Sequence, residues 1–337
     1  MELLQHLFAN ELSVAQEYFT ASTGRFVIAI LFFIVGLLLI MFGGDRFVDS
    51  SIVISKKLGI PQIIVGATIV SLGTTLPEVL VSTTAAFSGG NGADIAVGNA
   101  FGSIVCNTAL IAGLTQFCKP SKNVSTSSVG WRSILFFTIY VIVSAIGVIT
   151  NSIPRYVGVC LLLAFCLYAF LSIKLPGDAE DEEENSSDDS LIKAFVILVA
   201  CAALLFVGAK FLVNCGASVA KQVGVSESVI SLTFIALGTS LPELVTAITS
   251  MIKGYADVSV GNIIGANTLN LLLVIGIPST VAGIGSVGAN FLVTAVVGLV
   301  VMLLLMLPFI VKKRGYRLQG GLLLLIYVIY TVAQFVM

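Results

Sequence analysis

The sequence predicts an all-α membrane protein with ten transmembrane helices in two inverted five-helix repeats. Three observations lead to this fold class. Of the 337 residues, 57% are hydrophobic and only 10% are charged, a composition outside the usual range of soluble domains. Ten apolar runs are each long enough to cross the hydrocarbon core of a bilayer, which is ~30 Å thick. The chain also carries its most distinctive motifs twice.

The ten apolar runs occupy most of the chain, which leaves no room for a soluble catalytic domain. Any function must therefore reside inside the helix bundle or in short connections, and we expect a transporter rather than an enzyme. The runs cover residues 26–43, 62–87, 95–118, 133–150, 154–173, 191–213, 228–252, 258–281, 288–311 and 318–336.

Two polar segments lie outside the apolar runs. Residues 1–25 lack the basic start and small-residue cleavage pattern of a secretory signal, so we expect an extramembrane lead-in. Residues 178–189 read DAEDEEENSSDD, and such dense like charge favours a solvated linker. The predicted division of the chain is a lead-in at 1–25, a first repeat at 26–174, an acidic linker at 175–190 and a second repeat at 191–337.

The lysines and arginines predict the orientation in the membrane, because positive charge is retained on the cytoplasmic side. Thirteen of the seventeen lie in the odd-numbered connections between runs. We therefore expect the odd loops in the cytoplasm and both termini outside.

The two halves of the sequence repeat each other. Residues 59–83 read GIPQIIVGATIVSLGTTLPEVLVST and residues 224–248 read GVSESVISLTFIALGTSLPELVTAI. A second pair follows, with ADIAVGNAFGSIVCN at 93–107 and ADVSVGNIIGANTLN at 256–270. Each half holds five runs, and an odd number makes the second copy enter the membrane from the opposite side. Transporters built from inverted repeats bind their substrate near the midplane, where the halves meet.

Only two acidic residues, Glu78 and Glu243, fall deep inside the apolar runs. A charge at the bilayer centre costs ~2.5–3.5 kcal/mol on insertion scales, and such residues usually face a cavity on an ion path. The two glutamates occupy equivalent positions of the repeat, in GTTLPE at 73–78 and GTSLPE at 238–243. They are the predicted centre of the site.

The residues around each glutamate supply further oxygen ligands. Pro77 and Pro242 each remove a backbone donor, so we expect each helix to open there and release carbonyl groups around Gly73 and Gly238. Such backbone is tolerated at membrane depth only where it lines a cavity or is buried in protein. The hydroxyl groups that would join these carbonyls belong to Thr74, Thr75, Thr239 and Ser240.

The second motif predicts the opposite wall of the site. Asn99, Ser103 and Asn107 recur every four residues and therefore share one helical face, as do Asn262, Ala266 and Asn270. Glycines of the same motifs also form small-xxx-small pairs, at 98 and 102 and at 261 and 265, that favour close helix packing. We expect both roles, with the glycines packing and the amide face binding.

This set of ligands suits a hard cation, because it is rich in oxygen and contains no His or Cys arranged for coordination. Calcium accepts six to eight oxygens in flexible geometry, whereas magnesium requires a tight octahedron, so Ca²⁺ is the better fit. Sodium ions or protons would compete for the same oxygens. A carrier that moves only when loaded would then exchange one ion for the other.

The paired GTTLPE and GTSLPE motifs, followed by GNAFGSIVCN and GNIIGANTLN, resemble the two alpha-repeats of the Na⁺/Ca²⁺ exchangers, within the calcium/cation antiporter superfamily. The resemblance covers essentially all ten runs. It implies that the first run of each half, residues 26–43 and 191–213, slides across a fixed core. It also implies an ion site whose ligands for Ca²⁺ are Glu78, Glu243, Thr74 and Thr239. The implied ligands for Na⁺ are Thr75, Ser240, Ser103 and Asn107. The resemblance further places Asn270 and the backbone near Ala236 and Val70 or Ser71 in the same site.

Two positions depart from the family pattern. Ala266 stands where many members have serine, so one hydroxyl ligand for sodium is missing. Asn270 stands where some prokaryotic and potassium-dependent members have aspartate, which argues against potassium co-transport. The short linker also predicts that the chain has no calcium-binding regulatory domain.

Three alternatives stay open at this point. The cation/proton exchangers of the same superfamily share the architecture, but their motifs carry additional acids in the second and seventh spans. An intramembrane acid protease would need paired aspartates for acid and base catalysis, and the predicted spans contain none. A passive channel is commonly a symmetric oligomer around a pore, whereas this chain completes its own site from two halves.

We therefore expect a Ca²⁺/Na⁺ antiporter without a cofactor. Its partners would be Ca²⁺, Na⁺ and the lipid bilayer, with no nucleic acid and no obligate protein partner. The short linker favours a prokaryotic plasma membrane as the location.

Overall fold

A computed structural model of the chain describes residues 12–88, 92–122, 126–174, 190–222, 236–287 and 290–336. The named elements among these residues are all helices. Nine of the described helices are long and apolar enough to cross a membrane. This confirms the predicted all-helical membrane fold. The predicted span at 228–252 is only partly described, and the acidic segment at 178–189 lies outside the described residues.

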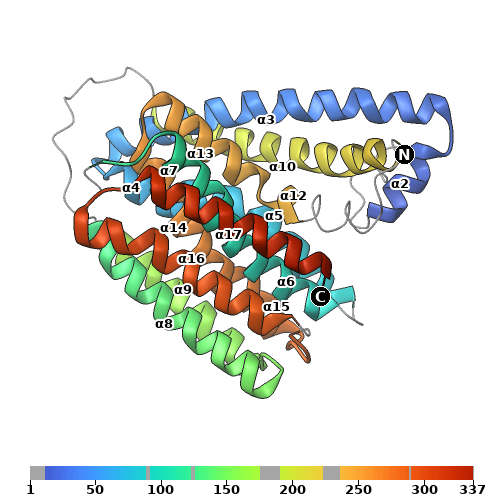
Figure 1. Cartoon of the computed structure of the whole chain (residues 1–337). Coiled ribbons are helices and arrows are strands. Elements are labelled where there is room, and N and C mark those ends of the chain that lie inside the picture. The colour runs from blue at the N-terminus through green and yellow to red at the C-terminus, as the bar shows by residue number, and fades with distance from the viewer. Residues whose placement is uncertain are drawn as a thin grey trace.

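Two long helices, α3 (Thr23–Leu58) and α10 (Leu191–Gln222), pack against each other and form an arm beside the rest of the bundle (Figure 1). Glycines allow the close approach: a Cβ atom on Gly36 would lie 2.9 Å from the Gly208 carbonyl oxygen, and one on Gly43 would lie 3.2 Å from Leu204. Contact positions rise along α3 as they fall along α10, so the two helices run antiparallel.

The helix α3 continues well past the predicted end of the first apolar run at residue 43. No proline interrupts it after that point, and Gly59 ends it in the left-handed conformation with φ 62°. Asp45 and Asp49 therefore lie within a helix, beyond the end of the apolar run.

The described part of the N-terminal lead-in docks on the arm. It forms the short helix α2 (Leu12–Thr20), whose Phe19 packs in a buried cluster with Phe211 and Cys215 of α10. The Arg25 guanidinium lies 4.2 Å from the centre of the Tyr18 ring, which adds a cation–π contact between α2 and the start of α3.

The centre of the bundle is built from four groups of helical segments, two from each half. The most buried is α14, in which every residue from Val258 to Leu269 is buried. The segments are α4 (Gln62–Val65), η1 (Gly66–Val70) and α5 (Ser71–Ser88); α6 (Gly92–Val105), η2 (Cys106–Ala112) and α7 (Gly113–Cys118); α12 (Ala236–Thr239) and α13 (Leu241–Lys253); and α14 (Ala256–Leu269), η4 (Asn270–Ile275) and α15 (Gly276–Val281).

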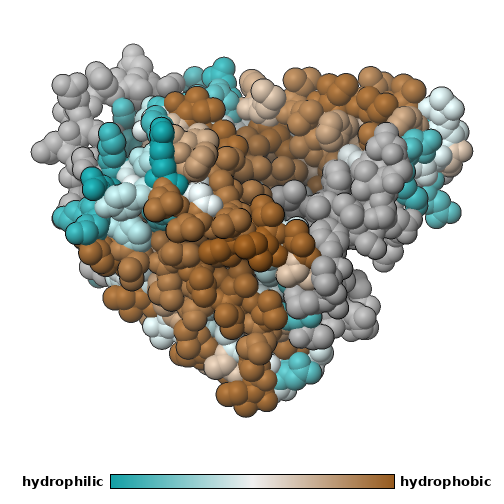
Figure 2. Space-filling view, in the orientation of Figure 1, coloured by the Kyte–Doolittle hydropathy of each residue, from teal (hydrophilic) through white to brown (hydrophobic). Residues whose placement is uncertain are grey.

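The remaining described helices, α8 (Thr126–Thr150), α9 (Arg155–Lys174), α16 (Phe291–Lys312) and α17 (Arg317–Val336), complete the bundle. They expose large apolar side chains such as Ile149, Leu307 and Val328. Figure 2 shows one face of the molecule on which such side chains form a broad apolar surface, with polar groups gathered near its margins. An outer surface of this kind matches contact with hydrocarbon rather than water.

Glycine packing between the halves follows the sequence prediction where the structure tests it. A Cβ atom on Gly261 would collide with the Ile63 carbonyl group, and one on Gly265 would collide with Ser71 Oγ and the Ala67 carbonyl oxygen. The α14 backbone therefore lies directly on α4 and η1. The other pair, Gly98 and Gly102, meets no described atom within 4 Å, and the mirrored segment at 223–235 lies outside the described residues.

The expectation that both prolines open their helices is half wrong. Pro77 lies inside the continuous helix α5, whereas the second motif breaks at Ser240, between α12 and α13, with φ −90° and ψ 7°. Proline has a backbone angle that is compatible with a helix, so it removes one hydrogen bond without having to end the helix. In the first half the irregular backbone is instead the wide π turn η1, which ends at Val70, shortly before the motif begins at Gly73.

Candidate functional site

The two glutamates lie on helices from opposite halves of the molecule. Glu78 is on α5 and Glu243 is in the first turn of α13. Their side chains are buried, with exposures of 0% and 1%, and their carboxylates are close enough for the two charges to interact. A buried like-charge pair of this kind is costly unless a cation or a proton balances it.

Each carboxylate lies beside a hydroxyl group from the other half. Thr75, on α5, donates a hydrogen bond of 3.3 Å to Glu243 Oε1. Ser240, at the break before α13, lies beside the Glu78 carboxylate and donates to Ser103 Oγ on α6 over 3.4 Å. Side-chain oxygens from both halves therefore lie next to one another in the same site.

Several buried polar atoms at this point of the bundle have no hydrogen-bond partner among the described residues. They include both carboxylate oxygens of Glu78, although Ser240 is nearby, and Oε2 of Glu243. Both amide atoms of Asn107 and of Asn270 belong to the same group. Buried polar groups normally have partners, so a concentration of unpaired oxygens marks a place suited to a cation.

The two asparagines lie in mirrored irregular turns. Asn107 is the second residue of η2 and Asn270 is the first residue of η4, and both turns are π-helical. A π turn replaces the usual i+4 hydrogen bonds with i+5 bonds and widens the helix locally, and such turns are frequent at functional sites. The widened backbone occurs where α6 and α14 reach the level of the glutamates.

The two threonines that follow the motif glycines are each held by an asparagine of the opposite half. Thr74 Oγ1 donates to Asn262 Oδ1 over 3.3 Å, and Thr239 Oγ1 donates to Asn99 Oδ1 over 3.2 Å. Thr74 is buried and Thr239 is half-buried. The interaction of Asn99 and Asn262 with the threonines is a feature that the helical spacing did not reveal.

The structure thus brings together most of the predicted site residues. Glu78, Glu243, Thr75, Ser240 and Ser103 form the contacts described above, and Ala266 is fully buried on α14. Ala236 begins α12, and its side chain lies outside the described residues. Among the described residues no three His, Cys, Asp or Glu side chains lie close enough to hold a metal by themselves, so any cation here needs neutral oxygens as well.

The arm touches the glycine of each motif. A Cβ atom on Gly73 would lie 2.9 Å from the tip of the Phe47 ring on α3, and one on Gly238 would collide with Val213 on α10. The arm helix of each half is therefore in contact with the residue that precedes the site threonines of that half.

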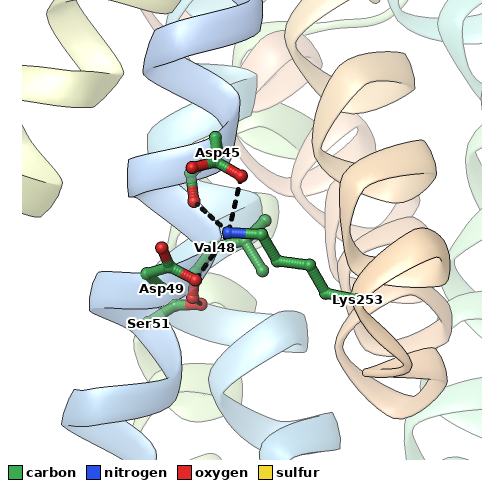
Figure 3. A network of polar contacts seen from close by, with 5 residues as sticks. All are labelled: Asp45, Val48, Asp49, Ser51 and Lys253. Atoms are coloured by element: carbon green, nitrogen blue, oxygen red, sulfur yellow. Dashed lines mark hydrogen bonds and ion pairs between the residues drawn. The ribbon is translucent and has the colours of Figure 1, made fainter.

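A second polar contact joins the arm to the core away from the glutamates (Figure 3). The Lys253 ammonium group at the end of α13 lies 2.6 Å from Asp45 Oδ1 and 2.6 Å from Asp49 Oδ1, both on α3. It also donates to the Asp45 carbonyl oxygen over 3.1 Å. The spacing of the two aspartates, one helical turn apart, is the signal that could have indicated a shared partner.

The family model described as sodium/calcium exchanger protein matches residues 28–174 and 193–336. The chain is 35% identical over 265 residues to the inner membrane protein YrbG of Escherichia coli, which covers 76% of this chain and 80% of that protein. It is 26% identical over 345 residues to the sodium/calcium exchanger MaX1 of Methanosarcina acetivorans, which covers 90% of this chain and 98% of that protein.

A solved structure has a similar fold. The sodium-calcium exchanger NCX_Mj, soaked with Na⁺ and Sr²⁺, superposes with a TM-score of 0.79 at 27% sequence identity. The match covers 90% of this chain and 98% of that structure. The resemblance that the paired motifs indicated is confirmed by both kinds of comparison.

Proposed function

Because the chain belongs to the sodium/calcium exchanger family and is a cation antiporter of the membrane, we propose that it exchanges Ca²⁺ for Na⁺ at the site around Glu78 and Glu243. The observation that carries the proposal is the pair of buried carboxylates from opposite halves, three of whose four oxygens have no hydrogen-bond partner among the described residues. Two carboxylates neutralise one divalent cation, and the surrounding hydroxyls, amides and carbonyls are the hard ligands that Ca²⁺ prefers.

The proposed Ca²⁺ ligands are Glu78, Glu243, Thr74 and Thr239. The proposed Na⁺ ligands are the same glutamates with Thr75, Ser240, Ser103 and Asn107, joined by Asn270 and the backbone near Ala236. Several Na⁺ ions would thus use oxygens that a single Ca²⁺ also needs. Occupation by one ion then excludes the other, which is the condition for exchange at one site.

Exchange without leakage follows from the cost of an empty site. Two buried carboxylates without a cation are unfavourable in a low-dielectric interior, so the rearrangement that changes access is favoured only when ions balance their charge. The proposed moving element is the arm of α3 and α10. It contacts Gly73 and Gly238 directly, so a displacement of the arm changes the surroundings of the site threonines.

Asn270 favours exchange that does not require potassium. Asn107 and Asn270 form a pair of neutral amides, and neither adds a third acid near the two glutamates. A site of this charge balances one Ca²⁺ without a further cation.

We also propose that both termini face outward and that the repeats are 26–174 and 191–337. The proposed location is a prokaryotic inner membrane, which is the location that the name of the relative YrbG gives for that protein.

Flux into proteoliposomes tests the proposal. Purified protein would be reconstituted, and ⁴⁵Ca²⁺ uptake would be measured under an outward gradient of Na⁺, K⁺ or H⁺, each imposed separately with pH and membrane potential clamped. We expect uptake only with the Na⁺ gradient. Uptake that follows the pH gradient alone would replace the proposal with Ca²⁺/H⁺ exchange, and uptake without any counter-ion would indicate a channel.

Glu243→Gln protein reconstituted at the same density is the control for leakage and for passive binding. It retains the shape of the side chain and removes the charge. Uptake equal to that of the wild type in this variant would contradict the assignment of the site.

A further inference from the structure

A tyrosine of α9 reaches the π turn that precedes the first motif. Tyr168 is 2% exposed, and its hydroxyl donates a hydrogen bond of 2.6 Å to the Ala67 carbonyl oxygen in η1. The two residues are 101 positions apart in the sequence, so the bond forms only when α9 has packed against the centre of the bundle. Tyr168 is not among the residues assigned to the ion site.

The wide turn changes the hydrogen bonding of the Ala67 carbonyl group. In an α-helix this carbonyl would accept from the amide of Ser71, four residues later. The Ser71 amide instead donates to the carbonyl oxygens of Gly66 and Thr68. A buried carbonyl that loses its helical partner needs another donor, and the Tyr168 hydroxyl supplies it.

Arg132 on α8 helps to set the direction of the tyrosine proton. Its buried guanidinium group forms a hydrogen bond with the Tyr168 oxygen, and a guanidinium group can only donate. Ser172, one turn further along α9, lies near the same oxygen, but its hydroxyl has no hydrogen-bond partner among the described residues. The single proton of the phenol is therefore directed to the Ala67 carbonyl oxygen.

Both α9 and the turn pack closely against helices of the second half. A Cβ atom on Gly158 of α9 would collide with Thr280 of α15. A Cβ atom on Gly265 of α14 would collide with the Ala67 carbonyl oxygen itself. The donor and the acceptor of this hydrogen bond are thus each held in place by the opposite half.

The width of the turn decides which face of α5 points into the site. A π turn contains about one residue more than an α turn, and each residue of a helix turns the chain by about 100°. If η1 contracted to α geometry, α5 would have to rotate relative to it, because α14 packs directly on η1. Thr75 and Glu78 are on α5, so both side chains would leave their positions beside Glu243.

We propose that Tyr168 is a positioning residue for the ion site and that Arg132 orients its hydroxyl. The hydroxyl stabilises the wide form of η1, and the wide form keeps Glu78 turned toward Glu243. The inference rests on the proposed function, because it takes the two glutamates as the centre of the ion site. It requires no contact between Tyr168 and an ion.

Two tyrosine-to-phenylalanine variants form a matched pair for the test. Tyr168→Phe removes the hydroxyl that reaches the π turn. Tyr140→Phe removes a similarly buried hydroxyl of α8, which donates over 2.9 Å to the Ala295 carbonyl oxygen of α16. Ala295 lies inside a continuous α-helix, so its carbonyl keeps a helical partner when the tyrosine is changed.

Equilibrium ⁴⁵Ca²⁺ binding to purified full-length protein in detergent would be measured for the wild type and both variants. We expect Tyr168→Phe to weaken Ca²⁺ binding by about tenfold and Tyr140→Phe to weaken it by less than about twofold. Thermal unfolding without Ca²⁺ would give the loss of stability in each variant. Equal losses of affinity in the two variants, or no loss in Tyr168→Phe, would overturn the proposal.

Amide hydrogen exchange of a peptide that covers residues 62–72 reports on the turn itself. We expect Tyr168→Phe to speed exchange in this peptide by about threefold or more, and Tyr140→Phe to leave it unchanged. Arg132→Gln, which keeps the tyrosine, should speed it in the same direction. It supplies a second reading if Tyr168→Phe does not yield folded protein.

The outcomes separate this inference from the function on which it rests. Wild-type protein that binds no Ca²⁺ would refute the proposed function and the inference with it. Wild-type protein that binds Ca²⁺, together with a Tyr168→Phe variant whose affinity and exchange match those of Tyr140→Phe, would refute the inference alone.

Discussion

In the first half of the molecule Pro77 lies inside the continuous helix α5, whereas in the second half the chain breaks at Ser240, two residues before Pro242. The carboxylates differ in the same way: Glu243 accepts a hydrogen bond from Thr75, and neither oxygen of Glu78 has a described partner. An inverted repeat whose halves had identical conformations would be equally accessible from both sides of the membrane. The local differences between two nearly identical motifs are therefore what can select a side.

The arm shows a second difference between the halves. The alignment that pairs Glu78 with Glu243 pairs Asp45 with Lys210, Asp49 with Asn214 and Lys253 with Ser88. The ion pairs of Figure 3 therefore have no equivalent combination of side chains at the mirrored positions. One end of α3 is tied to the core by this combination of one lysine and two aspartates, which the mirrored positions do not repeat.

Removing either glutamate charge should have the largest effect and should be equal in the two halves. Glu78→Gln and Glu243→Gln each leave a divalent cation with only one balancing carboxylate. We expect Ca²⁺ uptake into proteoliposomes to fall by about 100-fold or more in both variants. Size-exclusion chromatography and circular dichroism would verify folding. A large loss in only one variant would mean that one half alone binds the ion.

Enlarging the two motif glycines should affect transport to different extents in the two halves. A methyl group on Gly73 would lie 2.9 Å from the tip of the Phe47 ring, while one on Gly238 would collide with the β-branched Val213. Overpacking of this kind costs about 1–3 kcal/mol. We expect Gly238→Ala to slow Na⁺-driven Ca²⁺ uptake by about tenfold and Gly73→Ala to slow it less.

The control for these variants is Gly24→Ala, on the arm itself, where an added Cβ atom meets nothing within 4 Å. Its uptake rate should match that of the wild type. If Gly73→Ala and Gly238→Ala matched it too, contact between the arm and the motifs would have no part in transport.

Breaking the ion pairs of Lys253 should have a smaller effect, on rate rather than on affinity. The lysine side chain is 23% exposed and the two aspartates about half exposed, so solvent weakens the interaction. We expect Lys253→Met to change the uptake rate by about two- to fivefold with little change in the half-saturating Ca²⁺ concentration. Lys57→Met, at an exposed position of α3, is the matched control. Restoration by the charge exchange Lys253→Asp with Asp49→Lys would identify the pairing itself as the cause.

The gentlest test is Ala266→Ser, which restores a hydroxyl at the position that mirrors Ser103. Ala266 is fully buried, so the added oxygen must fit among packed neighbours. We expect the half-saturating Na⁺ concentration to change by about threefold and that for Ca²⁺ to change less. Identical sodium dependence would indicate that this position does not contact sodium in either half.

Much of the fold was predictable because it follows from local patterns in the sequence. Apolar length predicts the spans, and the rarity of acids inside them points to Glu78 and Glu243. The π turns were not predictable, since their wide hydrogen-bond pattern depends on packing between distant helices such as α14 and η1. The different behaviour of Pro77 and Pro242 could not be read from almost identical letters for the same reason.

The hydrogen bonds between the two halves could not be predicted from sequence patterns either. Helical spacing places Asn99 on the same face as Ser103, but the contact with Thr239 arises only when the two repeats are assembled. Likewise, the apolar run ends before Asp45 and Asp49, so its length does not indicate that the helix continues through them.

The docking of α2 on α10 has a practical consequence. Phe19 is anchored beside Phe211 and Cys215, so the amino-terminal segment is carried by whichever part of the molecule bears α10. A fluorophore attached near residue 12 would move with that part, and a second fluorophore on α8 would remain with the bundle. Energy transfer between the two dyes would then give an optical record of each turnover in a single reconstituted molecule.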